Sequence, residues 1–179
     1  ASGNATRTAV ETWMADSLRE CAEHGKEFGV IVAVQNHADF ISTGEEHLSL
    51  LKKVDHQWCA ALVDTGKYFT ADPYADIAMM VPHAVNWQIK ECPFGAGHET
   101  RTDLKKLLTI IRLAGYRGYL PIETLSSSAA AYDPFAVVPA FLAELRVALE
   151  ATADIAPPSL PEPPRPAPSL ESPASPAKA

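Results

Sequence analysis

Apolar residues occur along the chain in two patterns. One is the spacing of an amphipathic helix, and the other is the unbroken run of a short buried strand. Residues 11–28 follow the helical spacing, and Gly25 or Gly29 ends this helix. Its apolar face carries Trp13, Met14, Leu18, Cys21 and Ala22. Residues 30–34 form a β-branched run, which is expected of a strand buried on both faces. The pattern therefore predicts a helix followed by a buried strand.

This alternation of helix and strand continues to residue 151. Further strands are predicted at residues 58–63, 85–89 and 119–122. Further helices are predicted at residues 43–54, 72–80, 103–113 and 133–151. Such alternation predicts an α/β fold, a parallel sheet covered by helices. The periodicity fits either an open doubly wound sheet or part of a barrel.

Residues at the expected helix ends support these boundaries. Ser42 or Thr43 provides an N-cap for the second helix. Asp72 and Asp133 each precede a proline, and proline is favoured at the first helical position because its fixed φ suits a helix. Gly115 is placed to end the helix at residues 103–113.

The C-terminal segment differs in composition from the rest of the chain. Residues 156–179 hold nine of the fifteen prolines and almost no large apolar side chain. Such a segment cannot bury enough apolar surface to offset the entropy of ordering it. We therefore expect one globular domain at residues 1–155, followed by a disordered tail at 156–179.

Charge and cysteine content exclude several classes of protein. The net charge is −7 and no cluster of Lys and Arg is present, which argues against a nucleic-acid partner. No apolar run approaches the roughly 18–20 residues that cross a bilayer. Cys21, Cys59 and Cys92 are odd in number and form no CxxC pair, so we expect buried free thiols. We expect a cytoplasmic protein that binds neither nucleic acid nor membrane.

Each predicted strand finishes with an oxygen-bearing side chain. These residues are Gln35, Asp64, Gln88 and Glu123. The C-terminal ends of parallel strands form the ligand-binding face, so these side chains are expected to converge there. Four such oxygens suit Mg²⁺ or Mn²⁺. A plainer interpretation remains open, because polar residues often end strands and residues 64–66 also have good turn chemistry.

Four segments around these residues resemble those of a known family. They are GVIVAVQNH at 29–37, LVDTG at 62–66, NWQIKE at 86–91 and GYRGYLPIE at 115–123. In this order they resemble the fifth to eighth strand regions of the sugar phosphate isomerase/epimerase (xylose isomerase-like) TIM barrels. The resemblance spans roughly residues 11–150.

The resemblance implies the C-terminal half of a (β/α)₈ barrel, strands five to eight with their helices. A full barrel needs about 250 residues and eight strands. Residues 1–9 then correspond to the loop that follows the fourth strand. Either the sequence is a fragment of a longer protein, or two half-barrels pair. The expected partner is accordingly the N-terminal half-barrel or a second copy.

The resemblance also implies a divalent metal. Family members bind one through Glu, Asp, His and Glu, and these positions correspond to Gln35, Asp64, Gln88 and Glu123. Two of the four depart from the pattern, which lowers the negative charge available to a cation and favours Mg²⁺ or Mn²⁺ over zinc. Glutamine cannot take a proton, so epimerisation between two bases, one of them Gln35, is excluded.

The remaining chemistry is a route with one base. Glu123 would remove a proton α to a carbonyl, with the metal or Lys90 stabilising the enediolate. His37 is a possible second base, since it shares the face of Gln35 if the strand continues; otherwise it is a turn histidine. Lys90 and Asn36 are expected to bind substrate, although an ordinary salt bridge also explains Lys90.

These residues predict a metal-assisted isomerase or epimerase acting on a sugar or sugar phosphate. The alternative is a non-catalytic carbohydrate-binding barrel whose glutamines have abolished metal chemistry. Endonuclease-type chemistry on the same scaffold fits poorly, because it needs a His-rich zinc cluster and a basic surface. A Gly-x-Gly at residues 95–97 lies where barrel loops often bind phosphate, but a plain loop is the simpler interpretation.

Overall fold

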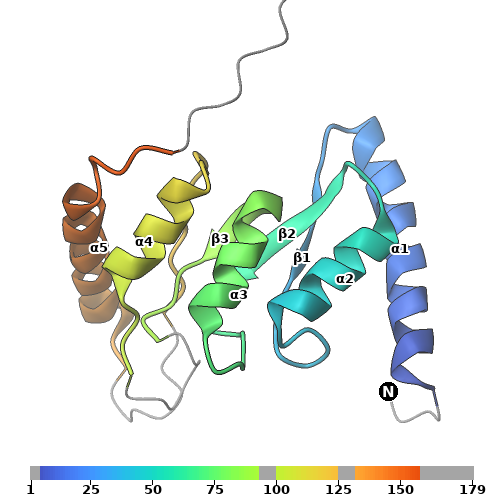
Figure 1. Cartoon of the computed structure of the whole chain (residues 1–179), viewed down its shortest axis with the longest axis horizontal. Coiled ribbons are helices and arrows are strands. Elements are labelled where there is room, and N and C mark those ends of the chain that lie inside the picture. The colour runs from blue at the N-terminus through green and yellow to red at the C-terminus, as the bar shows by residue number, and fades with distance from the viewer. Residues whose placement is uncertain (1–4, 93–99, 125–131, 158–179) are drawn as a thin grey trace, which may run out of the picture.

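The computed structural model describes residues 5–92, 100–124 and 132–157 of the 179-residue chain. Its sheet has three parallel strands in chain order: β1 (Val32–Gln35), β2 (Cys59–Asp64) and β3 (Ala84–Gln88). Figure 1 shows α2 and α3 packed in front of this sheet, with α1 at one end of the row and α5 at the other.

The helices are α1 (Arg7–Glu27), α2 (Gly44–Val54), α3 (Pro73–Met80), α4 (Leu104–Leu113) and α5 (Pro134–Ala151), with a short 3₁₀ helix at Val81–His83. The predicted caps at Thr43, Asp72 and Asp133 are confirmed. Thr43 accepts from the backbone N–H of Glu46 while the Glu46 side chain accepts from that of Thr43, which completes a capping box. Gly115 follows α4 with φ of 77°, as expected of a residue that ends a helix.

Only one face of the sheet is covered among the described residues. Ala61, Val63 and Trp87 point toward the helices and are fully buried, whereas Ala33 and Asn86 point the other way and are exposed. A doubly wound sheet would bury both faces, and its strand order would reverse. Three strands in sequential order with one covered face fit part of a barrel, and they also fit one half of a doubly wound sheet.

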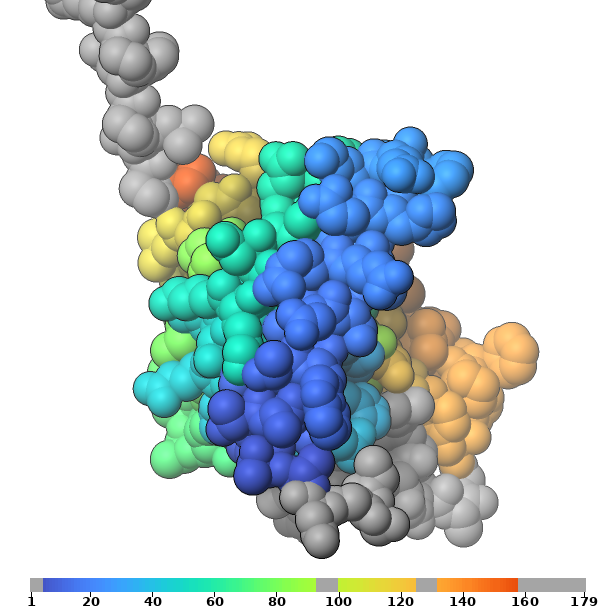
Figure 2. Space-filling model, turned by 90° about the vertical axis from the view of Figure 1, so that its right-hand side faces the viewer, coloured from blue at the N-terminus to red at the C-terminus, as the bar shows by residue number. Residues whose placement is uncertain are grey.

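The N-terminal helix departs from its prediction in extent and burial. It begins at Arg7 rather than residue 11, because Thr6 provides an N-cap by accepting from Ala9 N at 3.2 Å. Trp13 is 60% exposed and Cys21 is exposed, whereas Met14 and Leu18 pack against the core and Ala22 is buried, so the predicted apolar face is core only in part. The buried residues of α1 are Ala15, Ala22 and Gly25. The helix forms the outer surface at its end of the molecule, as Figure 2 shows, and small residues mediate its close packing.

The expectation of buried thiols is likewise wrong for Cys21, while Cys59 and Cys92 are half-buried. All three are free thiols. The helical spacing correctly predicts that Cys21 lies on the same side of α1 as Trp13 and Leu18. In the part of the chain that the structure describes, nothing covers Cys21 on that side.

The first strand is shorter and more exposed than predicted. It begins at Val32, and the preceding Val30 and Ile31 are 55% and 45% exposed. Only Val34 packs under the helices. The prediction of burial on both faces is wrong for this strand, since β1 is the edge of the described sheet and its inner face is open.

The fourth predicted strand is reduced to a single parallel bridge between Ile89 and Ile122. Ile89 N donates to Pro121 O at 2.9 Å, and Glu123 N donates to Ile89 O at 3.0 Å. Pro121 has no N–H of its own to extend the ladder. The prediction of a four-residue strand was therefore wrong in extent, but the bridge still fixes Glu123 beside β3.

Two apolar clusters hold the helices to the sheet. The larger lies between β2, β3 and helices α3 to α5, and includes Val63, Trp87, Ile89, Leu107, Leu108 and Phe141. The smaller joins α1, α2 and β1 and includes Leu50 and Val54. The described residues contain no helix long and apolar enough to cross a membrane. The expected tail, apart from residues 156 and 157, and the Gly-x-Gly segment lie outside the described residues.

Candidate active site

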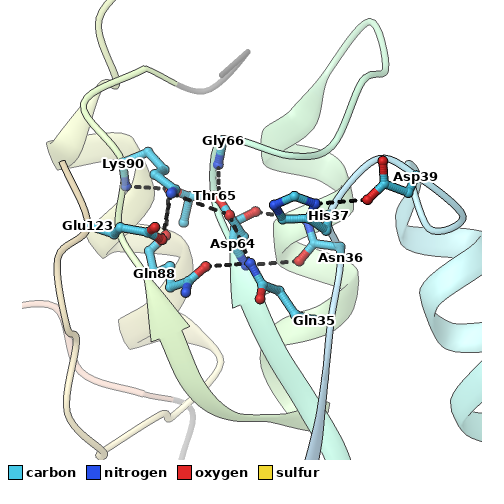
Figure 3. A network of polar contacts seen from close by, with 10 residues as sticks. All are labelled: Gln35, Asn36, His37, Asp39, Asp64, Thr65, Gly66, Gln88, Lys90 and Glu123. Carbon is cyan, nitrogen blue, oxygen red and sulfur yellow. Dashed lines mark hydrogen bonds and ion pairs between the residues drawn. The ribbon is translucent and has the colours of Figure 1, made fainter. Parts of the chain in front are cut away.

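The four strand-end residues come together at the C-terminal edge of the sheet (Figure 3). Gln35 Nε2 donates to Asp64 Oδ2 at 3.2 Å and to Gln88 Oε1 at 2.6 Å. Lys90 Nζ lies 2.6 Å from Glu123 Oε2 and 3.5 Å from Asp64 Oδ2. The structure therefore joins all four predicted side chains, with Lys90, in one polar cluster.

Strand register explains why these residues meet. Gln35 pairs with Leu62 across the first ladder, and Asp64 pairs with Gln88 across the second. Side chains alternate along a strand, so Lys90 shares the inner face of Gln88. The bridge at Ile89 then aligns Glu123 with Lys90 from the neighbouring segment.

Asn36 has a different position from the one expected of a substrate-binding residue. Its side chain is fully buried, and its Nδ2 donates to Asp64 O at 2.8 Å. Its Oδ1 accepts from Asp64 N, also at 2.8 Å. The amide thus continues the ladder between β1 and β2 by one step after the strand has ended. Asn36 therefore fixes the backbone of Asp64, and its role in substrate binding stays a prediction.

Asp64 is a buried carboxylate held from several sides. Its Oδ1 accepts from Gly66 N at 2.9 Å, and its Oδ2 accepts from Gln35. Burial raises the pKa of the Asp64 carboxyl, and the Gly66 N–H and the Lys90 ammonium oppose that rise. The turn chemistry that the sequence predicted at residues 64–66 is present, because the Gly66 N–H donates to the Asp64 carboxylate.

Thr65 is a site residue that the sequence analysis missed. Its Oγ1 accepts from Lys90 N at 2.8 Å and donates to Gln88 O at 3.3 Å, and its N–H donates to the same carbonyl at 3.0 Å. These bonds hold the chain beyond β3 against the end of β2. The identity of Thr65 alone gives no signal for this, since any small turn residue satisfies the local pattern.

Lys90 lies between the two carboxylates. Its side chain is 9% exposed, that of Asp64 is 1% exposed and that of Glu123 is 33% exposed. Lys90 Nζ and Glu123 Oε2 form an ion pair at 2.6 Å, and this buried oxygen has no other polar partner among the described residues. The salt bridge that the sequence left open for Lys90 is present.

His37 stands apart from this cluster. β1 ends at Gln35, and the chain turns at Ala38 with φ of 73°, so the strand does not continue to place His37 on the inner face. Its ring is largely exposed, with Nδ1 3.0 Å from Asp39 Oδ2 (Figure 3). No hydrogen bond or ion pair joins it to the four strand-end residues within the described segments. The parity argument for a second base is not supported, and the catalytic role stays a prediction.

The arrangement fits a divalent metal poorly. A metal would need oxygen lone pairs directed at one point, yet Gln35 presents its N–H₂ to Asp64 and Gln88. The ammonium of Lys90 is already next to both carboxylates. Within the described ranges, no three His, Cys, Asp or Glu side chains form a group that could hold a metal ion. The predicted Mg²⁺ or Mn²⁺ ligands meet, but they meet around an ammonium and an amide N–H₂.

Comparison with known proteins agrees with the geometry. A protein-family model described as xylose isomerase-like TIM barrel matches residues 1–147. The fold is that of an α/β protein with a parallel sheet, and the chain belongs to the xylose isomerase-like TIM barrel family. No curated protein matches the sequence.

Solved structures of similar fold include several sugar epimerases. Apo 3-keto-D-glucoside 4-epimerase from E. coli has a TM-score of 0.68 at 17% identity, over 82% of this chain and 57% of its own. An L-ribulose 3-epimerase has a TM-score of 0.70 at 18% identity, over 90% and 62%. A xylose isomerase-like TIM barrel protein from Mycobacterium smegmatis, in complex with magnesium, has a TM-score of 0.63 at 18% identity, over 84% and 54%. This chain thus spans less than two thirds of each of these structures.

Proposed function

We propose that this site catalyses proton transfer at a carbon next to the carbonyl of a sugar or sugar phosphate, as an isomerase or epimerase. The observation that carries the proposal is the placement of Lys90 Nζ 2.6 Å from Glu123 Oε2, at the C-terminal edge of parallel strands. An acid–base carboxylate next to a fixed cation is what enediolate chemistry requires. Family membership and the sugar epimerases of similar fold support the choice of substrate class.

Glu123 is the general base in this proposal. Its side chain is a third exposed although Oε2 is buried against Lys90, so a bound sugar would reach the carboxylate at its other oxygen. The base takes the proton from the carbon α to the carbonyl, and the C–H electron pair moves into the carbonyl to form an enediolate. Lys90 stabilises the oxygen that gains negative charge, and Asp64 holds Lys90 in place from the buried side.

Gln35 restricts the stereochemistry of the reaction. A glutamine cannot accept a proton, so no second base faces Glu123 from the end of β1. With one base, the proton that leaves is returned to the same face at the neighbouring carbon, while the hydroxyl proton passes to the former carbonyl oxygen, and together these transfers give aldose–ketose isomerisation. Inversion at one carbon requires an acid on the opposite face, and His37 is the residue predicted for that role. One-base isomerisation is therefore the preferred form of the proposal.

The sequence-based prediction of Mg²⁺ or Mn²⁺ remains part of the family resemblance, and one structure of similar fold is a magnesium complex. No step is assigned to a metal here, because Lys90 supplies a cation beside the developing charge. The whole protein is proposed to be a complete (β/α)₈ barrel, to which this chain contributes strands five to eight.

A rate comparison between matched variants tests the proposal. Glu123→Gln keeps the shape of the side chain but removes the base, and we expect aldose–ketose interconversion to fall by about 10²- to 10⁴-fold. Glu20→Gln, on the exposed surface of α1, should retain the wild-type rate. The measurement is product formation from a panel of aldoses, ketoses and their phosphates, made on the full-length protein. Equal rates for wild type and Glu123→Gln would reject the role of Glu123.

One observation favours the second candidate, a carbohydrate-binding barrel without catalysis. Gln35 and Gln88 bond to each other at 2.6 Å, and both stand where the family resemblance implies metal ligands. Amide pairs of this kind suit hydrogen bonding to sugar hydroxyls. Tight sugar binding without any turnover, in wild type and Glu123→Gln alike, would favour this candidate.

A further inference from the structure

The oxygens that would coordinate a metal already have nitrogen partners in the pocket. Asp64 Oδ2 faces Gln35 Nε2 at 3.2 Å and Lys90 Nζ at 3.5 Å. Gln88 Oε1 accepts from Gln35 at 2.6 Å, and Glu123 Oε2 lies 2.6 Å from Lys90. A dication could bind only if Gln35 turned its amide and Lys90 withdrew.

Lys90 has little freedom to withdraw. Its backbone N–H donates to Thr65 Oγ1 at 2.8 Å, and its carbonyl accepts from Thr102 Oγ1 at 2.7 Å. Gly66 lies against its side-chain stem so closely that a Cβ at Gly66 would be 2.8 Å from Lys90 Cγ and 2.9 Å from Cys92 O. The backbone and stem of Lys90 are thus fixed on two sides, which directs the ammonium toward Glu123 and Asp64.

The charges of the cluster also argue against a bound dication. The two carboxylates and one ammonium leave the cluster with a single net negative charge. Removing one partner from a buried ion pair is strongly unfavourable, because the other charge is left without compensation. A metal bound between the carboxylates would lie beside the ammonium of Lys90, whose side chain is only 9% exposed.

We propose that Lys90 is the resident cation of this pocket, in place of the divalent metal that the family resemblance implies, so that the site is complete without metal. This inference deepens the proposed function and rests on the same site. Its test measures cation binding and stability rather than turnover, so either claim can fail while the other stands.

The test compares the full-length protein after treatment with EDTA, in the presence and absence of excess MnCl₂. Mn²⁺ binding is followed by the electron paramagnetic resonance signal of the free ion, and stability by the melting temperature. We expect wild type to show no Mn²⁺ binding and no change in melting temperature. Lys90→Met leaves two neighbouring carboxylates unpaired, so its melting temperature should fall by about 5 °C or more without metal. Mn²⁺ should restore at least half of that loss.

Lys105→Met is the matched control, because Lys105 is exposed on α4, and it should behave as wild type in both conditions. A Lys90→Met variant that folds only with Mn²⁺ would also support the proposal. Wild-type Mn²⁺ binding with a Kd below about 100 µM that disappears in Glu123→Gln would overturn it. A Lys90→Met variant with wild-type stability and no affinity for Mn²⁺ would also overturn it, because Lys90 would then not compensate the charge of the two carboxylates.

Discussion

At the scale of single residues, the site depends on side chains that hold the backbone as much as on those that face the pocket. Asn36 is fully buried and makes two 2.8 Å hydrogen bonds to the backbone of Asp64. Thr65 likewise holds the chain around Lys90, because its hydroxyl accepts a hydrogen bond from the backbone N–H of Lys90. The accuracy with which Glu123, Asp64 and Lys90 meet therefore depends on residues that need not contact substrate.

Removing the Asn36 amide should cost stability as well as alignment. Asn36→Ala leaves the N–H and C=O of Asp64 buried without partners, and we expect unfolding free energy to drop by about 2–3 kcal/mol. Asn86→Ala provides the control, because Asn86 is exposed on the neighbouring strand and should change stability by less than about 0.5 kcal/mol. Urea denaturation measures both. An Asn36→Ala variant as stable as Asn86→Ala would contradict the positioning role.

Residue identities could predict the pocket but not its internal contacts. Gln35, Asp64, Gln88 and Glu123 stand out in the sequence because each follows an apolar run, and parallel strands place such positions at one edge. Which nitrogen faces which oxygen depends on register and rotamer, and neither leaves a signal in a single sequence. The role of Asn36 and the closeness of Lys90 to both carboxylates therefore appear only in three dimensions.

At the scale of elements, α2 is fixed to the sheet by a buried histidine. His47 Nδ1 lies 2.8 Å from the Tyr68 hydroxyl, and its Nε2 lies 3.0 Å from Val34 O, the carbonyl before Gln35. Burial lowers the pKa of His47 to about 4, outweighing the opposite effect of the Val34 carbonyl. The neutral ring thus connects α2 to the strand that carries Gln35.

This histidine should make stability depend on pH. Its folded pKa lies below the unfolded value near 6.5, so the unfolded chain binds more protons between those values and stability falls as pH falls from about 6.5 toward 4. We expect a loss of about 2 kcal/mol from this residue at pH 5 relative to pH 7.5. Denaturation at the two pH values measures it. His47→Gln should reduce the difference, while His24→Gln, on the exposed surface of α1, should preserve it.

The sequence predicted the type of each helix and strand better than it predicted where each begins and ends. The aspartates before Pro73 and Pro134 gave correct helix starts, because the capping interaction is local. The burial of β1 was wrong, since it depends on what covers the inner face, and nothing in residues 30–34 encodes that. The fourth predicted strand forms only one bridge, because Pro121 lacks the N–H that a longer ladder needs.

At the scale of the whole molecule, the described chain leaves apolar surface open at one end. A groove of about 430 Å³ between α1 and β1 is lined mainly by apolar side chains, among them Val10, Trp13, Met14, Leu18 and Val34. The nearby Val30 and Ile31 are about half exposed. On the proposal that this chain supplies strands five to eight of a barrel, the remaining strands would cover this surface.

We therefore expect the isolated chain to self-associate without a defined stoichiometry, because an uncovered edge strand and an apolar groove favour aggregation. Light scattering on the purified chain measures this. Co-expression with a segment that supplies the first half of a barrel should produce a soluble complex. A stable, soluble homodimer of the chain alone would contradict the fragment interpretation and favour half-barrels that pair.

The central claim, that Glu123 beside Lys90 moves a proton at a sugar carbon, is tested most directly by deuterium exchange. The full-length protein is incubated in D₂O with a ketose or ketose phosphate that it binds, and the ¹H NMR signal of the hydrogen α to the carbonyl is followed. We expect the wild-type protein to remove this signal, and Glu123→Gln to bind the same sugar while the signal persists. Retention of the signal with wild-type protein on every sugar it binds, or its loss at an equal rate with Glu123→Gln, would contradict the claim.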